Sequence, residues 1–467
     1  MTSTYQFREN SVIALEDIQL QSALHQVSSS FTGRRNDAFA LVPDAEQMRD
    51  HFKAMRANTL ANLAEHLETF EKNATAAGVV VHWAKDGAAA RQIVLDLARK
   101  HDVKLVAKSK SMATEEIHLN QALEEAGIDP IETDLGEYLI QLAGQPPSHI
   151  IAPAIHMTTA QAAALLSEQV GSELPVDAKV LMREARALLR QQFIDAGMGI
   201  TGGNIMVAES GSLVLVMNEG NGRMVTTLPK IHVALVGLEK IVPTWDDAAV
   251  WLSVLARSAT GQPLSIYTNM ITGPRRPTDT EGPEEVHIIL LDNGRADLVG
   301  TKYEEVLQCI RCGACLNICP VYGTAGGHAY GSPYSGPIGA VITPLLHGLE
   351  EYSGLPQASS LCGACKEICP ARIDLPRMLL ALRHDEVTQN ISPAGEQRAE
   401  RWAAWVMGGS GRMKTATGLG RVGQRLFLRD GKLSLPAALH PAPGRDLPSL
   451  APKSFRQMWQ DGEVDHE

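Results

Sequence analysis

The seven cysteines constrain this chain more than any other feature of its sequence. All lie between positions 309 and 369 of the 467-residue chain: Cys309, Cys312, Cys315, Cys319, Cys362, Cys365 and Cys369. A secreted protein stapled by disulfides would spread its cysteines through the fold, and an odd count would leave one unpaired. The clustering therefore indicates reduced thiols that bind metal.

The spacing of these cysteines is typical of proteins with two iron–sulfur clusters. The motifs are Cys309-x2-Cys312-x2-Cys315-x3-Cys319-Pro320 and Cys362-x2-Cys365-x3-Cys369-Pro370. In two-cluster ferredoxins the cysteine after x3 ligates the other cluster. A pair of zinc sites is the alternative, but zinc has no use for such a run. We expect cluster 1 on Cys309, Cys312, Cys315 and Cys369, and cluster 2 on Cys319, Cys362 and Cys365.

Cluster 2 is one thiolate short. A third local cysteine would fall three residues before Cys362, where the chain has Ser359. A three-thiolate site can hold a [3Fe–4S] cluster. It can also hold a [4Fe–4S] cluster whose fourth iron is bound by Ser359, water, another residue or a partner. Both alternatives stay open, and two [4Fe–4S] clusters are the main expectation.

Composition and charge exclude several other functions. The formal net charge is −11 and 5% of residues are aromatic, which argues against broad nucleic-acid binding. No apolar run reaches the roughly 18 residues that span a bilayer. The first ten residues, MTSTYQFREN, lack the basic and apolar regions of a secretory signal. We expect a cytoplasmic protein, with any membrane association through partners.

Helix and strand signals alternate before the cysteines. Short apolar strands are expected at 79–83, 104–107, 149–153, 205–208, 212–217, 231–238 and 286–291, with helices at 60–77, 117–126 and 177–196. This alternation predicts parallel strands with helices on both faces. The predicted domains are an N-terminal helical segment (1–60), an α/β domain (61–295), a mostly helical two-cluster ferredoxin-like domain (296–395) and a partly irregular C-terminal extension (396–467).

Three polar stretches of the α/β domain can line a pocket: 108–111, 201–204 and 209–212. The first follows a strand, and ligands of open α/β sheets sit at the carboxyl ends of strands. Lys108 and Lys110 would suit a carboxylate or phosphate, and Glu209 is either a buried acid or a hairpin residue. The glycines near 202 match neither a dinucleotide fingerprint nor a P-loop. We therefore predict an anion pocket of Lys108, Lys110 and Glu209, and no catalytic residue is assigned.

The order of these parts resembles the lactate utilization protein B family. The resemblance rests on SKSM at 109–112, ITGGN-x3-AESGS at 200–212, CIRCGACLNICPVY, SLCGACKEICP and the linker GGHAYGSPYSGPIGAVITPLL. It implies an α/β lactate-utilisation domain similar in fold to CoA transferases and sugar-phosphate isomerases. It also implies two [4Fe–4S] clusters, and two partners: a cysteine-rich-domain protein and a smaller lactate-utilisation-domain protein.

The family is the iron–sulfur subunit of a bacterial L-lactate-oxidising system. We therefore expect an electron-transfer component of an L-lactate dehydrogenase complex rather than a complete enzyme, with a quinone as acceptor. The alternative is a self-contained enzyme that uses the α/β pocket on an acyl or phosphorylated substrate, with structural clusters. A third alternative, an assembly or scaffold protein, requires redox-silent clusters.

Overall fold

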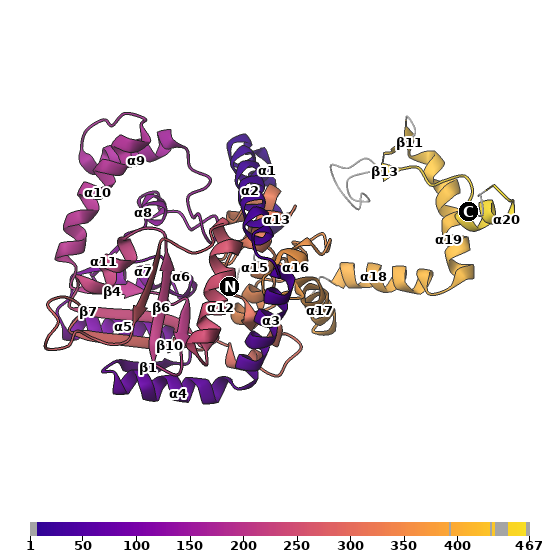
Figure 1. Ribbon diagram of the computed structural model, residues 1–467. Helices are drawn as coiled ribbons and strands as arrows, with labels where there is room; N and C mark the ends of the chain where they lie inside the picture. Colours follow the sequence, from indigo (N-terminus) through magenta and orange to yellow (C-terminus); the bar gives the residue numbers. More distant parts are fainter. Residues whose placement is uncertain (1–6, 392–393, 430–431, 435–446, 464–467) are drawn as a thin grey trace. The chain divides into compact units, whose positions relative to one another are not determined.

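A parallel sheet forms the centre of the α/β part, as the alternating pattern predicts (Figure 1). The computed structural model describes residues 7–391, 394–429, 432–434 and 447–463. The sheet has the strand order β1-β10-β7-β4-β2-β3, and every neighbouring pair is parallel. Its strands are β1 (Val80–Ala84), β2 (Leu105–Lys108), β3 (Asp129–Glu132), β4 (Met198–Thr201), β7 (Ile231–Gly237) and β10 (Glu285–Leu291).

Both faces of this sheet are covered, because its strands are apolar on both sides. In β7, Val233 and Leu235 pack with α5 and α7, whereas Ala234 and Val236 pack with α4 and a second sheet. The second sheet contains β8 (Ile241–Val242), β5 (Ile205–Val207), β6 (Ser212–Met217) and β9 (Tyr267–Ile271). The helices of this part are α4 (Leu63–Ala76), α5 (Gly87–Lys100), α6 (Met112–Glu116), α7 (Leu119–Glu125), α8 (Leu135–Leu142), α9 (Thr159–Val170), α10 (Ala178–Asp195), α11 (Asn221–Thr227) and α12 (Trp245–Thr260).

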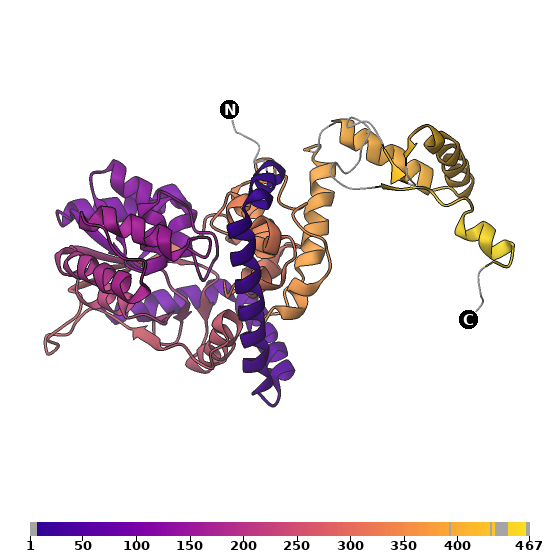
Figure 2. The same ribbon diagram turned by 90° about the horizontal axis from the view of Figure 1, so that it is seen from above.

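The N-terminal helices pack against the cysteine segment rather than forming a body of their own. They are α1 (Phe7–Glu16), α2 (Ile18–Ala40) and α3 (Ala45–Ala61), and α2 contacts both α12 and α13 (Figures 1 and 2). The cysteine segment contains η1 (Ala296–Leu298), η2 (Glu304–Gln308), α13 (Ala314–Ile318), α14 (Tyr322–Ala325), η3 (His328–Tyr330), α15 (Gly336–His347), α16 (Ala364–Ile368) and α17 (Leu375–Thr388). One core joins residues of all these parts.

The chain divides into two compact units, residues 1–386 and 387–467. The second unit contains α18 (Ala394–Met407), α19 (Ser410–Gly423), η4 (Gln424–Leu426), a small antiparallel sheet and α20 (Phe455–Gln460). The strands of that sheet are β11 (Leu428–Arg429), β12 (Lys432–Leu433) and β13 (Leu447–Pro448). The C-terminal extension is thus more helical than expected. The Pro- and Gly-rich stretch 435–444 lies outside the described residues.

One local prediction was wrong, and β4 was not predicted. The expected strand at 149–153 is a loop, because the buried His149 accepts hydrogen bonds at Nδ1 from the backbone N–H groups of Ile151 and Ala152. The glycine-rich stretch 197–203 contains β4, which the sequence did not predict because glycine is rare in strands. A Cβ at Gly199 would lie 2.0 Å from the carbonyl oxygen of Val225, so the close approach of α11 requires glycine there.

A buried ion-pair network joins the sheet to the segment that follows it. Arg295 pairs with Glu116 at 2.7 Å and with Glu239 at 2.8 Å, and all three side chains are almost completely buried. Tyr334 of the cysteine segment donates a hydrogen bond to Glu116 Oε2 at 2.6 Å. The Arg295 charge offsets the burial cost of Glu239 and, with other nearby cations, lowers the pKa of that carboxyl to about 2.

The substitution Arg295→Met should strongly destabilise the first unit, because it leaves the buried Glu116 carboxylate without its cation and removes the nearest cation from Glu239. We expect a loss of about 3–5 kcal/mol in the free energy of unfolding. The control is Arg183→Met, which removes an exposed pair with Glu184 and should cost less than about 1 kcal/mol. Urea denaturation followed by circular dichroism measures both, and equal midpoints for the two variants would contradict the role of the network.

Candidate functional site: two thiol groups beside a cavity

Four thiols line one small cavity in the cysteine segment: Cys309, Cys312, Cys315 and Cys369. Burial, together with the neighbouring cysteines, raises the pKa of the Cys312 thiol to about 12 and that of Cys369 to about 11. Such thiols would stay protonated on their own, so a bound cation is the natural means of ionising them. The structure thus brings together the four residues expected to ligate cluster 1.

The backbone around this cavity also suits an iron–sulfur cluster. Gly313, directly after Cys312, has a φ of 75°, which glycine adopts without strain. The backbone N–H of Arg311 donates a hydrogen bond to Cys309 Sγ at 3.4 Å. Hydrogen bonds to the sulfurs are one of the means by which a protein sets a cluster's potential. A donor set of thiols and backbone N–H groups therefore fits the cluster that the spacing predicts.

The remaining three thiols form a second group, in which Cys362 is exposed and the other two are buried. Burial first, and then the charges of Cys319 and Cys362, raise the pKa of Cys365 to about 12, so these three residues are neighbours. Cys362 is exposed, and its pKa is lowered by the backbone N–H of Ala364 and then by the side chain of Ser360. The two groups thus differ in solvent access. Ser360 carried no signal in the sequence.

Ser359 takes the place that Cys309 has in the first motif. The backbone N–H of Leu361 donates to Ser359 Oγ at 3.1 Å, just as that of Arg311 donates to Cys309 Sγ. Arg311 and Leu361 occupy matching positions and both have a positive φ, 60° and 55°. The two loops therefore share one backbone conformation, with an oxygen where the first has a sulfur.

Arginines of the N-terminal helices hold the second motif. Arg35 donates to the carbonyl oxygen of Ile368, and Arg49 to that of Cys369, each at 2.8 Å. Both side chains are buried. The second cysteine motif is therefore fixed by α2 and α3 as well as by its own sequence.

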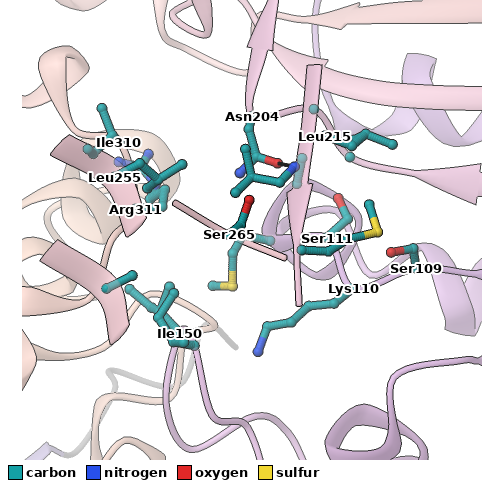
Figure 3. A pocket seen from close by; sticks show the side chains of 18 of the residues that line it. Ser109, Lys110, Ser111, Ile150, Asn204, Leu215, Leu255, Ser265, Ile310 and Arg311 are labelled. Atoms are coloured by element: carbon teal, nitrogen blue, oxygen red, sulfur yellow. Dashed lines mark hydrogen bonds between the residues drawn. The ribbon is translucent and has the colours of Figure 1, made fainter. Parts of the chain in front are cut away.

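A cavity of about 410 Å³ lies between the α/β sheet and the first cysteine loop (Figure 3). The carboxyl ends of β2, β4 and β7 contribute Ser109 to Ser111, Gly202 to Asn204 and Glu239 with Lys240. The cysteine segment contributes Ile310, Arg311 and Tyr334. The cavity thus lies where parallel sheets bind ligands, and one of its walls is the loop between Cys309 and Cys312.

The structure separates the three residues of the predicted anion pocket. Lys110 lines the cavity and pairs with Glu137 at 3.1 Å. Lys108 does not, because its amino group is buried against Glu132 at 2.5 Å. Glu209 is also absent from the lining, because its carboxylate accepts the backbone N–H of Trp245 at 2.6 Å. Of the three polar stretches, 108–111 and 201–204 contribute to the cavity and 209–212 does not.

Fold and thiol groups define a protein with an α/β domain followed by an iron–sulfur domain, and family models agree. The LUD domain model matches residues 67–291 and the 4Fe-4S dicluster domain model matches residues 305–373. No described helix is both long and apolar enough to cross a membrane.

Relatives match over nearly the whole chain. Lactate utilization protein B of Bacillus licheniformis is 40% identical, with 98% of this chain and 97% of the relative covered. The uncharacterized electron transport protein YkgF of Escherichia coli shows the same identity and coverage. Lactate utilization protein B of Macrococcus caseolyticus is 45% identical over 84% of this chain and 82% of its own. The chain belongs to the lactate utilization protein B family.

Single substitutions distinguish crossed from local ligation. We predict that Cys369→Ser perturbs the same cluster as Cys312→Ser, whereas Cys319→Ser perturbs the same cluster as Cys365→Ser, because those residues share a group. Electron paramagnetic resonance (EPR) of the dithionite-reduced variants, with iron analysis, gives the readout. If Cys369→Ser instead reproduced the spectrum of Cys365→Ser, ligation would follow the sequence motifs and the crossed assignment would be wrong.

Proposed function

We propose that this chain is the iron–sulfur electron-transfer subunit of a complex that oxidises L-lactate to pyruvate and allows growth on L-lactate. The observation that carries the proposal is the pair of thiol groups within one segment. Lactate oxidation releases two electrons, and an iron–sulfur cluster carries one at a time. Two neighbouring clusters can therefore take up the pair in sequence.

The exposure of Cys362 supports a direction for the electrons. The thiols of the first group are buried or half-buried and lie beside the cavity, whereas Cys362 of the second group is exposed. A partner can approach the second group without unfolding the chain. We infer that electrons leave through cluster 2 to a partner or acceptor, with a quinone as the expected final acceptor.

Exposed aromatic side chains of the second unit support binding to partner subunits. Trp402 and Trp405 of α18 are 64% and 58% exposed, and Met407 is 66% exposed. Aromatic residues and methionine are enriched at protein interfaces. The expected partners are a cysteine-rich-domain protein and a smaller lactate-utilisation-domain protein, in the cytoplasm or held at the membrane by those partners.

Growth on L-lactate tests the proposal. In a strain without other lactate dehydrogenases, deletion of this chain should abolish growth on L-lactate but not on pyruvate. The wild-type gene should restore growth, and a Cys309→Ala, Cys312→Ala variant that is still expressed should not, because it lacks cluster 1 ligands. Wild-type growth of the deletion strain on L-lactate would refute the proposal.

The type of cluster 2 is a separate part of the proposal. We propose two [4Fe–4S] clusters, with Ser359 as the fourth ligand of the second, because its oxygen takes the place of Cys309 Sγ in the matching loop. A [3Fe–4S] cluster on three thiolates is the alternative. Ser359 differs from Ser360, whose side chain hydrogen-bonds to Cys362.

Iron and sulfide content with EPR of anaerobically purified protein separates these alternatives. Wild-type protein and Ser359→Cys should each give about eight irons and [4Fe–4S]⁺ signals on reduction. Ser359→Ala should lose one iron and show an oxidised [3Fe–4S]⁺ signal, whereas the control Ser360→Ala should not. A [3Fe–4S]⁺ signal in the wild type that ferrous iron does not convert would overturn the four-iron assignment.

A further inference from the structure

Arg311 connects the first cysteine loop to the large cavity. It lies between Cys309 and Cys312, and its backbone N–H donates to Cys309 Sγ. Its φ of 60° is unusual for a residue with a side chain. Its side chain lines the cavity between the loop and the sheet (Figure 3). A single residue therefore touches a predicted cluster ligand and a ligand-sized space.

The Arg311 guanidinium is buried without a hydrogen bond. The residue is 8% exposed, and its Nε, Nη1 and Nη2 atoms have no hydrogen-bond partner among the described residues. The ring of Tyr334 lies 4.7 Å from the guanidinium carbon. Glu239 Oε1 lies 3.6 Å from Nη2, too far for a hydrogen bond. Burial of such a donor set is costly unless an acceptor is supplied.

The carboxylates that line the cavity, those of Asp134, Glu219 and Glu239, accept hydrogen bonds from other groups of the protein. Glu239 Oε2 accepts from Arg295, and the Asp134 carboxylate accepts the N–H groups of Gly136 and Glu137 at the start of α8. Lys240 also lies close to Glu239, so several cations share that carboxylate. The contact of Arg311 with Glu239 at 3.6 Å is an ion pair without a hydrogen bond, so the guanidinium keeps N–H donors for an anionic ligand. A planar fork of N–H donors matches a carboxylate in particular.

Polar side chains at the carboxyl ends of β2 and β4 form part of the lining, and another wall of the cavity is apolar. Leu255, Ala256 and Ala259 of α12 line it together with Leu215 and Ile310. The volume of about 410 Å³ falls within the range of about 300–1,000 Å³ typical of pockets for mid-sized organic ligands. An acid of two or three carbons would leave much of this apolar wall uncovered. The wall favours a carboxylate attached to an apolar body of several carbons.

We propose that this cavity binds an organic monocarboxylate with an apolar body, and that Arg311 binds its carboxylate. The site belongs to the α/β domain and to the loop of cluster 1 at once. The proposal goes beyond electron transfer and does not depend on the role in lactate oxidation. A bound anion lies beside the cluster 1 loop, so binding shifts the reduction potential of that cluster to more negative values.

Three probes separate the carboxylate from the apolar body: hexanoate, acetate and hexanamide. Isothermal titration calorimetry with the anaerobic full-length protein should show that hexanoate binds at least about tenfold more tightly than acetate, because its four additional methylenes are buried. Hexanamide has the same shape without the charge, and should also bind at least about tenfold more weakly. Equal affinity for hexanoate and hexanamide, or no binding of hexanoate, would overturn the proposal.

Two variants locate the site. Arg311→Gln should weaken hexanoate binding by about tenfold or more, and should remove the effect of hexanoate on the cluster 1 potential. Ser265→Phe fills the cavity from the loop between α12 and β9, away from the cysteines, and should prevent binding with unchanged iron content. The control is Ser172→Phe on an exposed loop outside the lining.

The outcomes of these variants are independent of growth on L-lactate. Unchanged hexanoate affinity in Ser265→Phe would show that the probe binds elsewhere and would refute the site. Unchanged affinity in an Arg311→Gln protein with full iron content would refute the role of Arg311. Loss of lactate-dependent growth alone would contradict neither result, because hexanoate binding is measured on the isolated protein.

Discussion

The buried carboxylate of Glu239 is the point on which the arrangement of sheet and cysteine loop depends. It follows β7, the strand with the most buried environment in the sheet, and it pairs with Arg295 at the start of the segment that leads to Cys309. Arg56 of α3 donates to the backbone carbonyl of Glu239 as well as to that of Leu307. Buried charged side chains thus hold three parts of the chain together: the end of β7, helix α3 and the segment that leads to Cys309.

This arrangement makes the iron–sulfur segment a part of the α/β fold rather than an attached module. Trp251 of α12, Leu24 of α2 and the buried Cys312 belong to one core. Lys240, directly after Glu239, donates to the carbonyl oxygen of Cys309 at 2.8 Å. Two residues that follow β7 are therefore bonded, one to Arg295 ahead of the first cluster loop and the other to Cys309 within that loop. Cluster binding and folding of the first unit should be strongly coupled in consequence.

The sequence was sufficient for the features with local signals. The periodicity of 231–238 and 286–291 predicted β7 and β10, and the parallel α/β class is confirmed. The pairing of Lys108 with Glu132 could not be predicted, because it joins neighbouring strands whose order the sequence does not state. Arg311 was missed for a related reason. In the motif Arg311 is one of the two residues between Cys309 and Cys312. It lines a cavity only because the α/β sheet packs against the cysteine loop.

The two cysteine loops share one backbone conformation at the residue before the second ligand position, but they differ in which residue adopts it. Both loops have a left-handed residue before the second ligand position, and in both its N–H donates to the first. In the second loop that residue is Leu361, which packs against the core, and in the first it is Arg311. This left-handed conformation is strained for both residues. In both loops it places the N–H group for its hydrogen bond to the first ligand position. The charge at position 311 has no part in that bond; it lies over the ring of Tyr334, pairs with Glu239 and faces the cavity.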